Sequence, residues 1–357
     1  MIRRLTFAGP LEPAQLARLA HLRYVCDQDP GLSRRKSGGG FIYLSVRGTP
    51  LRNPHKIARI EALSIPPAWQ DVWICPASVG HLQATGRDAR RRKQYIYHER
   101  WQEAAALAKF ARLAKFGALL PTLRRAIAAR LACRRLTHER VLAGMIAVLD
   151  LTGIRVGNEE YVKENGSYGL STLRNRHVAV SQRKAELRFR AKGGIKRTAV
   201  IDRRAVVRLI RDCAQLPGSH VFQYVDDNEK IRPVHASDVN KYLQELASDS
   251  FTAKDFRTWK ASAYVAGKLF IRRNEPSTTR RRKRIVREIV DEAASMLSNT
   301  PSVCRNYYIH PGLLASYEQG TFGDDVGAMI PRKRKWLSVD DQILDRFLKS
   351  WKPTIES

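Results

Sequence analysis

A tyrosine pair, Tyr307 and Tyr308, lies near the C-terminal end of a chain that is rich in arginine and lysine. An unperturbed phenol has a pKa near 10, so its attack on a phosphate at neutral pH requires loss of the proton or cations that stabilise the phenolate. Candidate cations stand earlier in the chain, at Arg155, Lys192 and Arg257. A tyrosine pair alone is more often part of a core or an interface, but this combination indicates nucleophilic chemistry at a phosphate.

Arg155 and Arg257 each stand alone among apolar or small neighbours rather than in a run of charges. The planar guanidinium can hold two phosphate oxygens at once, and it stabilises the negative charge that grows in the transition state of phosphoryl transfer. A buried pair with a carboxylate is the alternative interpretation. The nearby candidates for that partner are Glu159, Glu160 and Asp255.

Lys192 lies between two segments of strand character, where Gly193-Gly194 predicts a tight turn. A lysine whose pKa is lowered by neighbouring arginines can donate a proton to a departing 5′ oxygen. A solvated lysine at a hairpin tip is the alternative. No cluster of Asp and Glu with metal-ligand spacing accompanies these residues, which favours chemistry without a metal.

The chain carries 64 Lys plus Arg against 34 Asp plus Glu, a formal net charge of +30. This balance predicts a polyanionic partner, and nucleic acid is favoured over an anionic membrane surface because no window of about 18 apolar residues exists. The first ten residues lack the apolar core of a signal peptide. We therefore expect a cytoplasmic, nucleoid-associated protein.

The cysteines are odd in number and widely separated, with no Cys-x-x-Cys pair. Their spacing predicts neither a disulfide framework nor a zinc site. They are Cys26, Cys75, Cys133, Cys213 and Cys304.

The pattern of elements predicts an α+β protein with a small mixed N-terminal domain (1–98), a mainly helical catalytic domain with a short β-sheet (99–320) and a C-terminal tail with one helix (321–357). Helical spacing is expected over 16–27 and over 203–297, including 238–247 and 285–297. Strands are expected at 41–46, 71–75, 170–180, 185–190 and 198–201. Caps are expected at Thr137 and at Ser338 with Asp341.

The segment Lys93-Gln-Tyr-Ile-Tyr97 predicts a strand on which Tyr95 and Tyr97 face the same side. The preceding run, Arg90-Arg-Arg-Lys93, suits phosphate contacts. A solvated loop would explain the charges alone, but the tyrosines favour a surface that meets DNA. The runs Arg280-Arg-Arg-Lys-Arg284 and Arg332-Lys-Arg-Lys335 are either phosphate contacts or ordinary basic surface.

Six motifs occur in an order that resembles the bacterial and poxvirus-like type IB DNA topoisomerases, within the eukaryotic-type topoisomerase I family, from roughly Asp29 to Leu314. They are Ile154-Arg-Val-Gly157, Tyr161-Val-Lys-Glu-Asn165, Gly169-Leu-Ser-Thr-Leu-Arg-Asn-Arg-His177, Phe189-Arg-Ala-Lys192, Lys254-Asp-Phe-Arg-Thr-Trp259 and Asn299-Thr-Pro-Ser-Val-Cys-Arg-Asn-Tyr-Tyr-Ile-His-Pro311. Each motif is weak alone, and the set is specific.

The resemblance implies a catalytic role for each matching residue. Arg155 and Arg257 would stabilise the transition state, Lys192 would be the general acid and Tyr308 the nucleophile. Asn299 stands where poxvirus enzymes have His, and it can donate a hydrogen bond but cannot titrate, so we expect a positioning role. The Asn and the Arg/Ala-rich composition favour a bacterial source over a large virus.

The resemblance also implies the tyrosine recombinase/type IB topoisomerase catalytic fold and relaxation of supercoiled duplex DNA through a 3′-phosphotyrosyl intermediate. It implies no cofactor, neither ATP nor a metal, no obligatory protein partner and a monomer that closes on DNA as a clamp. Contacts to DNA are expected from Gln94, Tyr95, Tyr97, Tyr161 and Lys254.

Two alternatives remain open from the sequence. A tyrosine recombinase or integrase shares the chemistry but usually carries His three residues before the second Arg, where this chain has Lys254. An architectural DNA-binding protein would keep the fold without the activity. Loss of strand cleavage in a Tyr308→Phe variant would separate an enzyme from the architectural protein.

Overall fold

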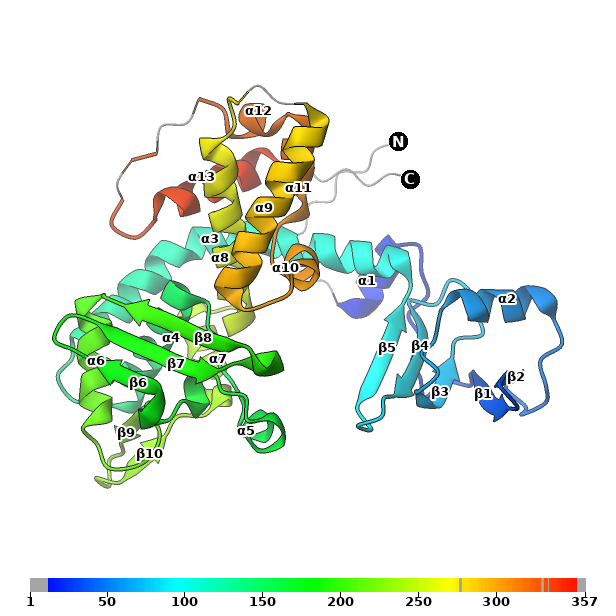
Figure 1. The fold of residues 1–357 in the computed structure, drawn as a ribbon, viewed down its shortest axis with the longest axis horizontal. Helices are drawn as coiled ribbons and strands as arrows, with labels where there is room; N and C mark the ends of the chain where they lie inside the picture. The colour runs from blue at the N-terminus through cyan, green and yellow to red at the C-terminus, as the bar shows by residue number, and fades with distance from the viewer. Residues whose placement is uncertain (1–11, 276–277, 329–330, 333, 352–357) are drawn as a thin grey trace. The chain divides into compact units, whose positions relative to one another are not determined.

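The computed structural model describes residues 12–275, 278–328, 331–332 and 334–351. The segment considered for a signal peptide (1–10), Lys333 of the second basic run and residues 352–357 of the predicted tail lie outside the described residues. The chain divides into two compact units, Met1–Arg112 and Leu113–Glu356, and the division falls within helix α3 (Glu99–Ala132) (Figure 1). The predicted boundary at residue 98 lies at the start of this helix.

The N-terminal unit contains an antiparallel five-stranded sheet in the order β2-β1-β3-β4-β5. Helix α2 (Pro54–Ala62), which Asn53 caps through the backbone N–H of Lys56, buries Ile60 against this sheet. The strands are β1 (Leu32–Ser37), β2 (Gly40–Leu44), β3 (Gln70–Ile74), β4 (Leu82–Arg87) and β5 (Lys93–Tyr97). The two strands predicted in this region therefore exist as β2 and β3.

The helix predicted over 16–27 is wrong in its second half. Helix α1 (Pro13–Leu19) ends early, and His21 adopts a left-handed backbone with φ of 53°. Beyond that turn the chain is extended, because Arg23 exchanges backbone hydrogen bonds with Val79 and His81. Tertiary pairing has overridden the helical pattern here.

The second unit is mainly helical, and its most deeply buried elements are α4, which Thr137 caps as predicted, and α8. Its helices after α3 are α4 (His138–Thr152), α5 (Glu159–Asn165), α6 (Arg204–Ala214), α7 (Ala236–Ala247), α8 (Ala253–Ile271), α9 (Thr279–Leu297), α10 (Pro301–Tyr307), α11 (Pro311–Gln319), α12 (Phe322–Val326) and α13 (Val339–Ser350). Ser338 and Asp341 form the predicted capping box of α13. The α+β class is confirmed.

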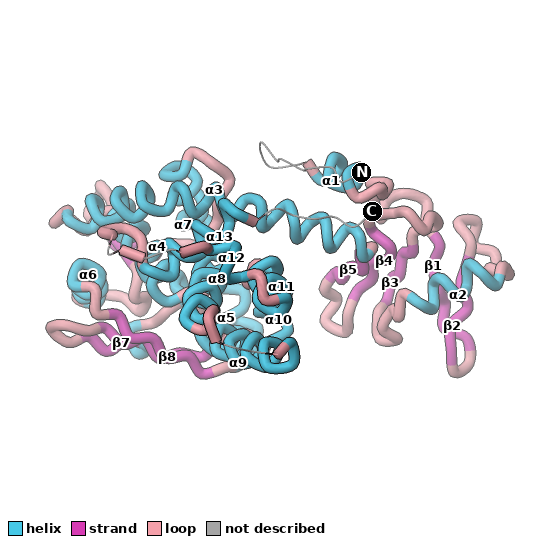
Figure 2. The backbone as a smooth tube through the Cα atoms, turned by 90° about the horizontal axis from the view of Figure 1, so that it is seen from above, coloured by secondary structure: helices cyan, strands magenta, loops and turns pink. Residues whose placement is uncertain are grey.

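A three-stranded antiparallel sheet, β6 (Val178–Val180), β7 (Ala185–Arg190) and β8 (Lys196–Ile201), lies beside α6 (Figure 1, Figure 2). The strand predicted over 170–180 forms only at its end. Residues 170–177 instead make two 3-10 turns, closed by side-chain bonds of Thr172 to Gly169 and of His177 to Arg174.

A short hairpin, β9 (Gln223–Val225) and β10 (Ile231–Pro233), interrupts the helical region predicted over 203–297. The Asp226 carboxylate accepts the backbone N–H groups of Asn228 and Lys230 and so builds the turn. Strands of three residues leave too short a pattern to be recognised in the sequence.

Helices α8, α9 and α10 pack together, and α13 packs along α8 (Figure 1). Helix α8 contributes a nearly continuous buried face that runs from Phe256 to Phe270. Among the helices of the described residues, none is both long and apolar enough to cross a membrane. The C-terminal ends of α4 and α9 and the start of α8 bring the predicted arginines together.

Candidate active site

Arg257 is held by the backbone at the ends of two helices. Its Nη1 donates to the carbonyl of Gly153, the residue after α4, and its Nη2 donates to the carbonyl of Leu297, the last residue of α9, at 3.2 Å. The last carbonyls of a helix lack partners within the helix and carry partial negative charge. Gly153 closes α4 with a left-handed φ of 65°, a conformation that glycine adopts without strain. Two helix ends thus fix one guanidinium.

Arg155 and Arg197 are held in the same way. Arg155 donates to the carbonyl of Ser298 at 3.4 Å and to the side-chain oxygen of Asn299. Arg197, in β8, donates to the carbonyl of Thr152 at 2.9 Å and to that of Ser295 at 3.3 Å. Arg257 and Arg197 therefore rest on the C-terminal ends of both α4 and α9, and Arg155 rests on the end of α9.

The carboxylates near these arginines in sequence are engaged elsewhere. Glu159 pairs with Arg174 and His220, both at 3.1 Å, and Asp255 accepts the backbone N–H of Thr252 at 2.8 Å. Within the described residues, no ion pair joins Arg155 or Arg257 to an acidic side chain. The alternative of a buried Arg–carboxylate pair with Glu159 or Asp255 is therefore wrong, and the positive charge of the cluster is not neutralised.

The electrostatics of the cluster follow from burial and mutual repulsion. Burial, and then the charge of Arg155, lower the pKa of Arg257 to about 10. The same two causes lower the pKa of Arg197. A group with a pKa of about 10 is still protonated at neutral pH, so three like charges coexist here. In the described part of the chain, the buried Nε of Arg257 and Nδ2 of Asn299 also lack an acceptor, so an anion would satisfy both.

Tyr308 lies at the end of α10 against this cluster. Thr300 caps α10 and Pro301 begins it, so the helix places Tyr308 at its C-terminal cap. The Arg257 guanidinium lies 4.9 Å from the Tyr308 ring centroid and hydrogen-bonds the phenol oxygen. Tyr307, by contrast, is 57% exposed. The structure therefore separates the two tyrosines, which their side-chain chemistry alone could not.

The phenol of Tyr308 has a lowered pKa. Burial raises the pKa, but the charge and hydrogen bond of Arg257 oppose burial, and the charges of Arg155 and Lys254 add to them, so the net shift is downward. Lys254 lies exposed in the first turn of α8. Cations around a half-buried phenol favour the phenolate, which is the nucleophilic form.

Ser262, a residue that sequence reasoning missed, fixes the backbone on both sides of this turn. Its fully buried Oγ donates to the carbonyl of Tyr308 at 3.1 Å and accepts the N–H of His310 at 3.0 Å. Arg197 was also missed. The only signals in the sequence were a lone hydroxyl in the apolar stretch of α8 and an Arg beside Lys196.

Lys192 stands apart from the other four predicted catalytic residues. It is exposed at the start of the 3-10 turn η3 (Lys192–Gly194), which joins β7 to β8 as the sequence predicted, with Gly193 and Gly194 both at positive φ. No hydrogen bond or ion pair among the described residues links Lys192 to Arg155, Arg257, Asn299 or Tyr308. The structure brings those four together and leaves Lys192 on a neighbouring loop.

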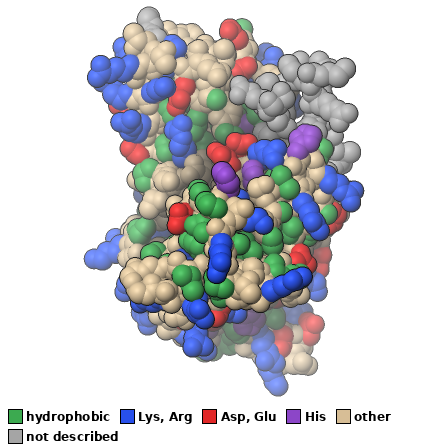
Figure 3. Space-filling model, turned by 90° about the vertical axis from the view of Figure 1, so that its right-hand side faces the viewer, with side chains coloured by type: hydrophobic (Ala, Val, Ile, Leu, Met, Phe, Trp, Pro, Cys, Tyr) green, Lys and Arg blue, Asp and Glu red, His purple; other side chains and the backbone are tan. Residues whose placement is uncertain are grey.

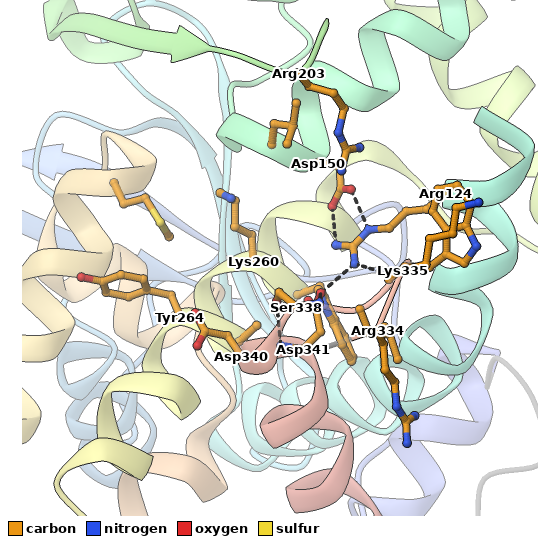
Figure 4. A pocket seen from close by; sticks show the side chains of 16 residues that line it. Arg124, Asp150, Arg203, Lys260, Tyr264, Arg334, Lys335, Ser338, Asp340 and Asp341 are labelled. Atoms are coloured by element: carbon orange, nitrogen blue, oxygen red, sulfur yellow. Dashed lines mark hydrogen bonds and ion pairs between the residues drawn. The ribbon is translucent and has the colours of Figure 1, made fainter. Parts of the chain in front are cut away.

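Behind Arg257, a buried ionic network ties α13 to α8 and α3 (Figure 4). Arg124 pairs with Asp150 at 2.8 Å and with Asp341 at 2.7 Å, and the indole N–H of Trp259 donates to Asp341 at 2.6 Å. Burial raises the pKa of Asp341, but the charge and hydrogen bond of Arg124 and the bond from Trp259 outweigh it and lower the pKa. Because Trp259 follows Arg257 closely on α8, the C-terminal helix braces the segment that carries Arg257.

The predicted DNA-facing strand exists as β5 in the N-terminal unit. The rings of Tyr95 and Tyr97 stack at 5.9 Å with an interplanar angle of 10°, so they share one side as predicted. Tyr95 is 48% exposed. The amide of Gln94 donates to Asp88 at 3.0 Å, and Lys93 pairs with Asp27 at 2.5 Å. Two of the predicted contact groups are thus held by carboxylates in the free protein.

Basic side chains are spread over the surface, as the face in Figure 3 illustrates. Tyr161, 49% exposed, lies on the short helix α5. In the run 280–284, Arg281 pairs with Glu275 and Arg284 with Glu288. This run is therefore partly neutralised, in contrast to the cluster around Arg257.

Comparisons with known proteins agree with this geometry. A family model described as "Eukaryotic DNA topoisomerase I, catalytic core" matches residues 98–321, and one described as "Bacterial DNA topoisomerase IB, N-terminal domain" matches residues 40–88. A DNA topoisomerase 1B of Acanthamoeba polyphaga mimivirus is 34% identical over 294 residues, which cover 81% of this chain and 88% of the relative.

More distant relatives match part of the chain. The DNA topoisomerase I of monkeypox virus and the DNA topoisomerase 1B of vaccinia virus (strain Copenhagen) are each 21% identical over 178 residues, which cover 48% of this chain and 52% of each relative. The predicted resemblance is therefore confirmed by both family models and by the mimivirus relative. This chain belongs to the type IB DNA topoisomerases, enzymes that act on duplex DNA.

Proposed function

We propose that this protein relaxes supercoiled duplex DNA by breaking and rejoining one strand through Tyr308. The observation that carries the proposal is the contact of the Tyr308 phenol with the Arg257 guanidinium, in a cluster that holds its charge without carboxylates among the described residues. A phenol of lowered pKa beside spare hydrogen-bond donors suits attack on a phosphodiester.

The reaction is a transesterification that conserves the number of phosphoester bonds. The Tyr308 oxygen loses its proton and forms a bond to phosphorus, while the bond from phosphorus to the 5′ oxygen breaks. The strand is left with a 3′-phosphotyrosine and a free 5′ hydroxyl. Lys192, exposed on its loop, donates the proton that the leaving oxygen takes up. Swivelling of the free end relaxes the duplex, and the 5′ hydroxyl then reverses the step.

Arg155 and Arg257 stabilise the pentacoordinate transition state, in which negative charge builds on the nonbridging oxygens. Asn299 adds its Nδ2, the donor without an acceptor in the described structure, and its Oδ1 orients Arg155. Loss of one such fixed donor typically costs about 10²–10³ in rate. The three side chains together account for a large part of the acceleration that strand cleavage requires.

Neither ATP nor a metal is required in this scheme, because the covalent intermediate conserves the energy of the broken ester. Duplex DNA is contacted by Gln94, Tyr95 and Tyr97 from one unit and by Tyr161 and Lys254 from the other. One chain supplies every side chain that the reaction uses, so the enzyme acts as a monomer.

The deciding experiment is relaxation of supercoiled plasmid in EDTA without ATP, followed by detergent trapping of the covalent complex. Wild type and Tyr307→Phe should relax the plasmid and attach to the 3′ end of the nick, while Tyr308→Phe should do neither. Requirement for a metal or ATP would refute the scheme. Recombined products from linear substrates would indicate a recombinase, and salt-sensitive binding without cleavage in every variant would indicate an architectural protein.

A further inference from the structure

Arg197 lies outside the five-residue catalytic set that the sequence predicted, yet it is anchored on the same two helix ends as Arg257. Its guanidinium bridges the carbonyls of Thr152 and Ser295, at 2.9 and 3.3 Å, and so joins β8 to the C-terminal ends of α4 and α9. The adjacent carbonyls of Gly153 and Leu297 hold Arg257. A single frame of helix ends therefore positions both arginines.

Strand β8 also begins directly after the loop that carries Lys192. The β7–β8 hairpin is fully paired up to the pair Arg190 and Lys196, and the backbone N–H of Ala191 closes the loop on the carbonyl of Ile195 at 2.8 Å. Arg197 follows Lys192 by five residues along this closed hairpin. A shift of Arg197 against the helix ends would therefore move the Lys192 loop with it.

The placement of Arg197 is electrostatically unfavourable in itself. Its side chain is partly buried, and the charge of Arg155 adds to burial in lowering its pKa. Two carbonyls, rather than a carboxylate, offset this cost. The guanidinium fork can bridge two helix ends in one plane, a geometry that a lysine with a single ammonium group does not reproduce.

We propose that Arg197 is a positioning residue for the general-acid step: by fastening β8 to the ends of α4 and α9, it holds the Lys192 loop in register with Arg257 and Tyr308. This inference rests on the proposed role of Lys192. A purely electrostatic role of Arg197, as a third cation acting on the phosphate, is the competing explanation.

The test uses full-length protein and a duplex oligonucleotide that carries a cleavage site mapped on plasmid DNA, made with either oxygen or sulfur at the 5′ bridging position. A thiolate leaves without protonation, because thiol pKa values lie near 8.5. Single-turnover cleavage is measured for wild type, Lys192→Ala, Arg197→Met and Arg197→Lys. The matched control is Arg188→Met, because Arg188 lies on the neighbouring strand and pairs with Glu186 in the exposed surface.

With oxygen, Lys192→Ala should cleave about 10²–10⁴-fold more slowly, and Arg197→Met about 10–10²-fold more slowly, since positioning errors carry costs up to that size. Sulfur should restore most of the rate of both variants. Arg197→Lys should fall between Arg197→Met and wild type, and Arg188→Met should match wild type on both substrates. DNA affinity should stay within about twofold throughout.

Equal slowing of Arg197→Met on both substrates, with Lys192→Ala still restored by sulfur, would overturn the positioning role and favour the electrostatic one. If sulfur fails to restore Lys192→Ala, the general-acid assignment fails first and the positioning role fails with it. Should Arg197→Met not fold, as judged by thermal unfolding, the comparison of Arg197→Lys on the two substrates decides the question in the same way.

Discussion

The guanidinium of Arg155 donates to the side-chain oxygen of Asn299, a partner that holds the arginine without neutralising it. This pairing matters because a carboxylate in the same place would form an ion pair and cancel the charge that a phosphate needs. Asparagine fixes the fork of Arg155 through a neutral oxygen and keeps its own Nδ2 available. The cluster therefore keeps its positive charge, because the partner that positions Arg155 is neutral.

Replacement of Asn299 by Asp should accordingly slow DNA cleavage more than replacement by Ala. The Asp side chain is nearly the same size and keeps the bond to Arg155, but it adds a negative charge that repels the phosphate. We expect about a 10²–10³-fold loss for Asn299→Asp and a smaller loss for Asn299→Ala in single-turnover cleavage. Equal or faster cleavage by Asn299→Asp would contradict the need for uncompensated charge.

The lowered pKa of Tyr308 predicts the direction of a pH effect. Since the phenolate forms at a lower pH than in free tyrosine, the cleavage rate should rise with pH and level off below pH 10. Arg257→Gln removes the largest favourable influence on the phenolate, so the plateau should move to higher pH and the rate should fall about 10²–10³-fold. Ultraviolet titration of wild type minus Tyr308→Phe reports the phenol directly. If the pH at which the cleavage rate rises were the same in Arg257→Gln as in wild type, this account would be refuted.

Ser262→Ala should lower the cleavage rate without weakening DNA binding. The substitution leaves the buried carbonyl of Tyr308 and the N–H of His310 without their shared hydroxyl, at a cost of about 1–3 kcal/mol. We expect roughly tenfold slower cleavage and a lower melting temperature. Ser316→Ala is the control, because Ser316 is also buried but its hydroxyl, within the described residues, donates to Leu313 of its own helix. A similar loss of cleavage rate in the control would indicate a general effect on stability.

Asp341 predicts an acid-sensitive contribution to stability. Its folded-state pKa lies below the unfolded value of about 3.9, so its stabilising effect is complete above that pH and is lost as the pH falls through the folded pKa. Asp341→Asn should reduce the free energy of unfolding by about 3–5 kcal/mol at neutral pH and flatten the acid limb. Asp345→Asn, which breaks only a pair with Lys349 within α13, should cost under about 1 kcal/mol. If Asp341→Asn lost stability at low pH to the same extent as wild type, Asp341 would not be the source of the acid sensitivity.

Several of the candidate site residues could be predicted, because the sequence states each side chain's chemical type directly. An Arg among apolar neighbours marked Arg155 and Arg257 as candidates, and the family resemblance, rather than side-chain chemistry, favoured Tyr308 over Tyr307. The supports could not be predicted. Every residue carries the same carbonyl, so nothing in the sequence says that those of Thr152 and Ser295 would lie at helix ends and receive Arg197.

The fold shows the same division. The long helices and the β7–β8 hairpin follow from periodicity and turn residues, and the caps at Thr137 and Ser338 were visible as residue types. The end of α1 depends on the pairing of Arg23 with distant Val79 and His81, and β9 and β10 are three residues each. Contacts of this kind are decided by tertiary partners, and a local pattern does not contain them.

The arginines at the ends of α4 and α9 repel one another in the free protein. This repulsion lowers the stability of the folded state. In the proposed reaction, the phosphates of DNA supply the negative charge that the cluster lacks. Added salt should therefore raise the melting temperature of the free protein while it weakens DNA binding, because it screens both interactions. The uncompensated charge that suits this cluster to catalysis therefore lowers the stability of the folded protein.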